Sequence, residues 1–160
     1  MRYLLFICFL NLFCLTEIYS QCRIQTNQRD DGATIRYMSP DRIGRADKFF
    51  MGASMQTNGI DFYVATISIF PNNAENLSGI MTIQFANSKS SKLEHISSQP
   101  TTFHGYPATL SIFYADTNDL KNIATSNMKM VMVRLQDGTL QLVKVSMNSN
   151  ILEAQYKCLK

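Results

Sequence analysis

The sequence predicts an α+β domain, mainly an antiparallel β-sheet with one or two short helices packed on one face. An all-β sandwich is the alternative. Apolar side chains alternate with a period of two along most of the chain, and Asn-Gly and Asp-Gly pairs separate strand-like runs. The chain has 160 residues, of which 46% are hydrophobic and 17% charged. This composition fits one folded domain and excludes a disordered chain.

The first 20 residues have the composition of a signal peptide. Arg2 precedes the apolar run 4–15, which is shorter than the ~20 residues that a membrane-spanning helix needs. Ser20 is small enough to precede a cleavage site. We therefore expect export to the periplasm or the extracellular space, with residues 21–160 forming one mature domain that has no membrane span.

Cleavage would leave two of the four cysteines in the mature chain. Cys8 and Cys14 would be removed, whereas Cys22 and Cys158 lie near the two mature ends. A pair of cysteines in an exported chain normally oxidises. We predict a disulfide between Cys22 and Cys158, which requires their Cα atoms to lie within about 7 Å. This bridge would leave no thiol as a nucleophile.

Strand patterns dominate the first two thirds of the mature chain. The predicted strands are residues 22–28, 34–38, 48–57, 60–70, 80–86, 92–97 and 108–114. The pair Asn58-Gly59 predicts a type I′ hairpin with a two-residue turn. Pro40 with Gly44 predicts a loop, residues 71–79 form a polar loop, and Pro100 begins another loop.

Two segments have helical features. Residues 116–127 can begin with Asp116 or Thr117 as the N-cap, and their apolar side chains recur at helical spacing. The tail 150–159 can be a strand or a helix, and a Glu three residues after an Asn is typical of a capping box, which favours the helix.

The clearest local pattern is a hairpin formed by residues 128–136 and 139–147 around Asp137-Gly138. A two-residue turn would place Leu135 opposite Leu140. Both faces of the hairpin would then be apolar. An antiparallel hairpin usually has one face in water, so we expect this one to be covered on both faces.

Candidate catalytic and metal-binding groups are few. His95 and His104 are the two histidines, and their separation does not match a zinc-ligand pattern. One alternative function is a hydrolase with dispersed catalytic residues around His95 or His104. Another is a Cu(I)-binding protein using Met128, Met130 and Met132, which alternate and would share one strand face. Core packing competes with the copper interpretation. We find no motif for a cofactor and expect none.

The favoured function is a non-enzymatic exported module that binds another protein or joins an envelope or extracellular assembly. Its formal net charge of +3 is spread among acidic neighbours, which argues against nucleic acid as a partner. The sequence specifies neither the partner protein nor the oligomeric state. Loop 71–79 is one candidate contact. The other candidate interaction surface is formed by Arg36, Arg42, Arg45, Phe49 and Phe50.

Overall fold

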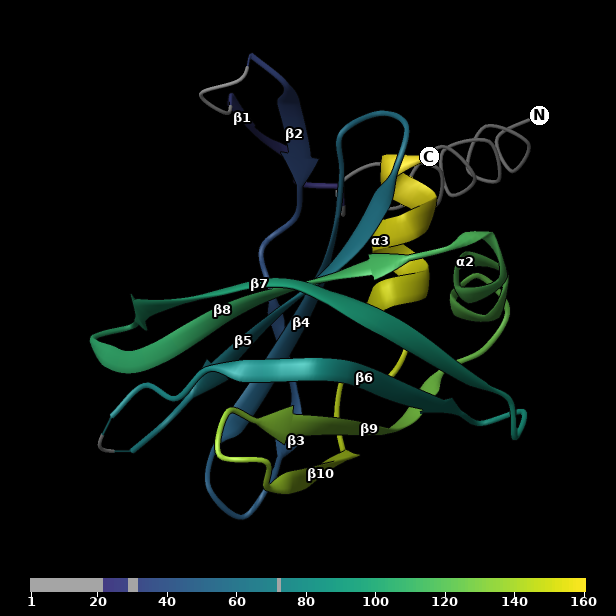
Figure 1. Ribbon diagram of the computed structural model, residues 1–160. Coiled ribbons are helices and arrows are strands. Elements are labelled where there is room, and N and C mark those ends of the chain that lie inside the picture. Colours follow the sequence, from purple (N-terminus) through teal and green to yellow (C-terminus); the bar gives the residue numbers. More distant parts are fainter. Residues whose placement is uncertain (1–21, 29–31, 72) are drawn as a thin grey trace, which may run out of the picture.

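The computed structural model describes residues 22–28, 32–71 and 73–160, and the predicted signal peptide lies outside these ranges. Within them the chain forms ten strands and two helices (Figure 1). The strands are β1 (Gln25–Gln28), β2 (Thr34–Tyr37), β3 (Asp41–Arg45), β4 (Phe50–Thr57), β5 (Phe62–Ile69), β6 (Leu77–Phe85), β7 (Ser90–Phe103), β8 (Tyr106–Ala115), β9 (Met128–Leu135) and β10 (Leu140–Val145). The helices are α2 (Thr117–Ile123) and α3 (Ile151–Leu159).

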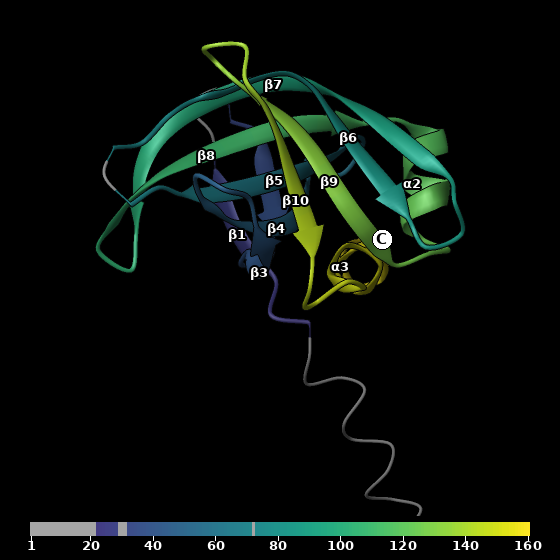
Figure 2. The ribbon, with the colours of Figure 1, turned by 90° about the horizontal axis from the view of Figure 1, so that it is seen from below.

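Eight of these strands close into an antiparallel barrel (Figures 1 and 2). Hydrogen-bonded neighbours follow the order β4-β3-β10-β9-β6-β7-β8-β5, and β5 pairs back with β4. β1 and β2 form an additional hairpin that pairs with β4. The predicted antiparallel sheet and two short helices are confirmed. The fold is mainly β and therefore close to the all-β alternative, but the sheet closes on itself into a barrel instead of forming the two layers of a sandwich.

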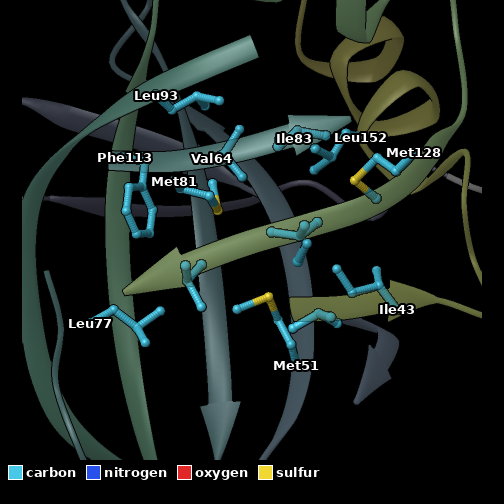
Figure 3. Packing of buried hydrophobic residues seen from close by; sticks show 14 of the residues in the cluster. Ile43, Met51, Val64, Leu77, Met81, Ile83, Leu93, Phe113, Met128 and Leu152 are labelled. Atoms are coloured by element: carbon cyan, nitrogen blue, oxygen red, sulfur yellow. The ribbon is translucent and has the colours of Figure 1, made fainter. Parts of the chain in front are cut away.

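The core lies inside the barrel, where apolar side chains from facing strands meet (Figure 3). The two helices contact each other, and α3 packs along β4. Ile123 of α2 and Leu152 and Leu159 of α3 extend the core beyond the strands. The largest buried side chains of the strands are Ile43, Met51, Met55, Leu77, Met81, Ile83, Phe85, Leu93, Phe113 and Leu135.

The predicted disulfide is confirmed. Cys22 and Cys158 are bonded, their Cα atoms are 5.6 Å apart, and they are 136 positions apart in sequence. The bridge therefore joins the segment before β1 to the last turn of α3. No helix in the described ranges is long and apolar enough to cross a membrane.

The β4–β5 hairpin forms where Asn58-Gly59 predicts a turn, but its loop is longer than predicted. Thr57 pairs with Phe62, so residues 58–61 make a four-residue loop. The Asn58 side chain accepts hydrogen bonds from the backbone N–H groups of Ile60 (2.9 Å) and Asp61 (2.7 Å). These side-chain bonds stabilise a turn without the type I′ geometry.

Two predicted loops are strands. The segment containing Gly44 forms β3, and β7 continues through Pro100 to Phe103. At Pro100, β7 pairs with β8 alone, because its pairing with β6 ends at Glu94. A proline is tolerated there because no ladder on the β6 side needs its missing N–H.

Both predicted helices form, with changes at their ends. Asp116 caps α2 by accepting from the Asp119 N–H, and Asp119 accepts in return from the Asp116 N–H. The helix ends at Ile123 and not at residue 127. The tail is helical as favoured, but the predicted capping box is absent, since Asn150 makes no side-chain cap hydrogen bond.

Candidate interaction surface

The register of the β9–β10 hairpin determines which of its side chains face outward. The Leu135 N–H donates to the Thr139 carbonyl at 2.9 Å, which leaves a three-residue loop, 136–138, with Gly138 at a φ of 88°. Such loops place a glycine in the left-handed region. The predicted two-residue turn is therefore wrong, and Leu142 lies opposite Met132.

This register separates the apolar side chains of the hairpin into two sets. Val131, Val133 and Val143 join the core, so the alternate positions face outward. Leu140 and Leu142 are 50% and 53% exposed. The prediction that both faces are covered is wrong for this face. With half-buried Met132 and with Ile80 from β6, which is 55% exposed, these leucines form what we call the apolar band: Ile80, Met132, Leu140 and Leu142.

A group of cations lies next to the apolar band, on β3 and β10. Arg45 and Phe50 are partners across the β3–β4 ladder. The guanidinium carbons of Arg42 and Arg45 lie 4.1 and 5.7 Å from the centroid of the Phe50 ring. Both distances are within the range of a cation–π contact. Phe50 thus holds two guanidinium groups at one place on the barrel wall.

Lys144 adds a third cation, because it is the register partner of Arg45 across the β3–β10 ladder. Like charges directly opposite each other destabilise a strand pair. In the described ranges the ion pairs are Lys48–Asp137 and Lys157–Glu153, so neither Arg45 nor Lys144 has a carboxylate partner there. We call Arg42, Arg45, Lys144 and Phe50 the basic cluster.

Gly44 brings β3 close to β10 beneath this cluster. A Cβ atom at Gly44 would overlap the backbone carbonyl oxygen of Lys144. The close approach fixes Arg45 beside Lys144. Because Leu142 is two residues from Lys144 on the same face of β10, the apolar band and the basic cluster are continuous. Together they are the outer-wall surface.

Asp137 lies at the hairpin tip next to the apolar band. Its carboxylate accepts a 2.8 Å hydrogen bond from the Thr139 N–H, which lowers the pKa of Asp137 below its ordinary value. Lys48, with its Nζ atom 3.9 Å away, lowers this pKa to a smaller extent. Asp137 is therefore an ionised group that already has two partners.

The structure brings together three of the five predicted surface residues. Arg42, Arg45 and Phe50 belong to the basic cluster. Arg36 instead donates from Nη2 to the Leu159 carbonyl at 3.0 Å, at the end of α3. Phe49 is buried, 3% exposed, because its ring packs on Phe70 with 5.0 Å between centroids.

Lys144, Leu140 and Leu142 are not among the predicted surface residues. Their alternation with buried side chains was visible in the sequence, but the face they occupy depends on the register. The predicted contact loop 71–79 is shorter than expected, because residues 77–79 belong to β6, and its described part is held to the barrel through backbone carbonyls. The Glu75 carbonyl accepts from the Thr109 hydroxyl at 2.6 Å, and the Leu77 carbonyl accepts from the Ser98 hydroxyl at 3.0 Å.

His95 lies close to a serine, in a geometry that does not activate it. His95 Nε2 is 2.8 Å from Ser98 Oγ, which also lies 2.7 Å from Ser111 Oγ. Ser98 has one proton, and its bond to the Leu77 carbonyl requires that proton. His95 must then donate to Ser98, whereas a general base must accept from its nucleophile. In the described ranges no carboxylate is hydrogen-bonded to His95.

His104 lies in the β7–β8 turn, with a φ of 50°.

The three methionines do not share one face. A register irregularity at the end of the β6–β9 ladder turns Met128 into the core, while Met130 and Met132 are half-buried on the outer side. The Met128 side chain therefore lies on the opposite side of the wall from those of Met130 and Met132. Within the described ranges, no group of three His, Cys, Asp or Glu side chains is arranged to hold a metal ion.

The chain matches no protein-family model, and comparisons with curated proteins and with solved structures find no match either.

Proposed function

We propose that this chain is an exported, non-enzymatic module that binds another protein through the outer-wall surface. One observation carries the proposal: Leu140 and Leu142, which flank the buried Gln141 and precede the buried Val143 on β10, keep half of their surface exposed beside Met132. Single exposed apolar residues are common on soluble proteins, whereas contiguous ones mark interaction sites.

Export is part of this proposal. The composition of residues 1–20 supports it. The Cys22–Cys158 bridge also supports it, because structural disulfides persist mainly in oxidising compartments. The bridge and the closed barrel give a rigid scaffold, and a rigid wall suits a binding surface because little conformational entropy is lost on association.

The test is a matched pair of surface variants. Leu142→Glu places a charge in the apolar band. Ile60→Glu makes the same change at the tip of the β4–β5 hairpin, where Ile60 is 87% exposed. Each variant would be used to capture proteins from the extracellular or periplasmic fraction of the native cell. A captured protein would then be purified and its affinity measured by calorimetry.

We expect one protein to bind the wild type and the Ile60→Glu variant equally, and to bind Leu142→Glu at least about 10-fold more weakly, as for a central contact. A photo-crosslinking residue at position 142 should join to that protein, and one at position 60 should not. Equal binding by both variants, or no protein captured at all, would contradict the proposal.

A further inference from the structure

The basic cluster places like charges next to each other, an unfavourable arrangement that the fold alone does not require. Arg45 and Lys144 are directly opposite each other, and Arg42 shares the Phe50 ring with Arg45. A neutral residue at either strand position would remove the repulsion between like charges. In the described ranges no acidic side chain offsets these charges with an ion pair. Such a group of cations fits a surface that is neutralised by a ligand.

The surroundings of the cluster favour a peptide over a long polyanion. A linear polyanion such as a sulfated polysaccharide gains affinity from an extended track of cations. Here the next outward-facing positions on β10 after Lys144 are Leu142 and Leu140. These positions are about 7 Å apart, twice the rise of a strand. β10 thus presents apolar, apolar and cationic groups in line. Arg134 of β9, opposite Leu140, donates to the Gly138 carbonyl of the hairpin loop at 2.8 Å.

We infer that the contacting segment of the partner protein is acidic at one end and apolar at the other, with carboxylates at the basic cluster and aliphatic side chains on the apolar band. The inference rests on the proposed function and adds the chemistry of the partner. Guanidinium groups held on Phe50 are oriented before binding, and arginine binds carboxylates in a bidentate manner.

The probe is the peptide Ac-Leu-Ser-Leu-Ser-Glu-Ser-Glu-amide, which in extended form carries two leucines and then two glutamates on one face. Its matched control has glutamine in place of both glutamates. Binding of each to the whole mature protein would be followed by NMR. We expect shifts at Arg45, Phe50 and Lys144, and about 10-fold tighter binding of the acidic peptide at low salt, decreasing as salt screens the charges.

Charge variants then test the cluster itself. Lys144→Gln should weaken binding of the acidic peptide by about 2- to 5-fold, the range for one exposed ion pair. Binding of the glutamine peptide should not change. Lys121→Gln on α2 removes the same charge elsewhere and should leave both affinities unchanged. The combined variant Arg42→Gln, Arg45→Gln, Lys144→Gln should bind the two peptides equally, and its melting temperature shows whether it is folded.

Two kinds of result would overturn the inference. One is equal binding of both peptides to the wild type, or peptide binding that Lys144→Gln does not change. The other is heparin binding more tightly than the acidic peptide at physiological salt and being weakened by the same variants, since that would assign the cluster to a polyanion. If either kind of result is obtained while Leu142→Glu still weakens binding of a partner protein, the proposed function stands and only the inference of an acidic segment is refuted.

Discussion

Gln155 on α3 accepts a 2.7 Å hydrogen bond through its Oε1 atom from the backbone N–H of Met55 on β4. Its Nε2 atom donates to the Ser39 carbonyl at 3.1 Å. Along this side of β4, pairing with β3 ends at Ala53 and pairing with β2 begins at Gln56. The side chain of Gln155 therefore occupies a gap in the barrel ladder and joins α3 to it.

The first prediction concerns this bond. Gln155→Leu would keep the size of the side chain but leave the buried Met55 N–H without a partner. We expect the free energy of unfolding to fall by about 1–3 kcal/mol, the cost of an unsatisfied buried group. Urea unfolding followed by circular dichroism measures it. Lys157→Ala on the same helix removes an exposed pair with Glu153 and should cost at most about 0.5 kcal/mol. Similar losses in the two variants would show that Gln155 does not support the ladder.

The second prediction concerns the disulfide. Replacing Cys22 and Cys158 by serine removes a link between residues 136 positions apart, and we expect a loss of about 2–5 kcal/mol in the free energy of unfolding. The same loss should follow when a reductant is added to the wild type, and the reductant should not affect the double variant. Equal stability of the double variant and the oxidised wild type would refute this role of the bridge.

The sequence predicts elements better than it predicts how they pair. The capping pattern at Asp116 and Asp119 is local, so the start of α2 follows from the sequence. The Cys22–Cys158 bridge follows from redox chemistry and from having a single pair. Closure of the barrel through β4, β5 and β8 does not follow from the sequence. Alternation of apolar and polar residues indicates which face of a strand is buried, but not which strands are its neighbours.

For the candidate site, a difference of one residue in strand register is enough to make the prediction from sequence fail. A turn of three residues in place of two moves Leu142 from Val133 to Met132 and moves Leu140 and Leu142 to the outer face. A one-residue shift exchanges the two faces of a strand. Arg45 and Lys144 are almost 100 residues apart, and only the β3–β10 ladder makes them neighbours.

The third prediction concerns pH. Burial raises the pKa of Asp119 above its ordinary value of 3.8, and a hydrogen bond from Ser91 offsets this only in part. A carboxyl with a raised pKa in the folded chain holds its proton more tightly there, so its contribution to stability is present at low pH and is lost as the pH rises through the folded pKa. We expect the wild type to lose stability relative to Asp119→Asn as the pH rises above 3.8 and through the raised folded pKa of Asp119.

Asp137→Asn is the control, because the contribution of Asp137 to stability should depend on pH in the opposite direction. The Thr139 N–H lowers the pKa of Asp137, so the stability it contributes is present above 3.8 and is lost as the pH falls through its folded pKa. Denaturant unfolding at a series of pH values measures both variants. If the difference between the wild type and Asp119→Asn stayed constant from pH 3 to pH 7, the buried carboxyl would not be the cause.

The last prediction tests the contact that places Arg45 beside Lys144. Gly44→Ala would put a methyl group onto the Lys144 carbonyl, a backbone atom that can move only if β3 and β10 separate. We expect the free energy of unfolding to fall by about 1–3 kcal/mol, the range for overpacking. Gly52→Ala is the matched control on β4, because its added Cβ would lie 3.2 Å from the Asp41 carbonyl oxygen and needs a smaller shift. A larger loss for Gly52→Ala than for Gly44→Ala would mean that the two strands do not approach as closely as the β3–β10 register requires.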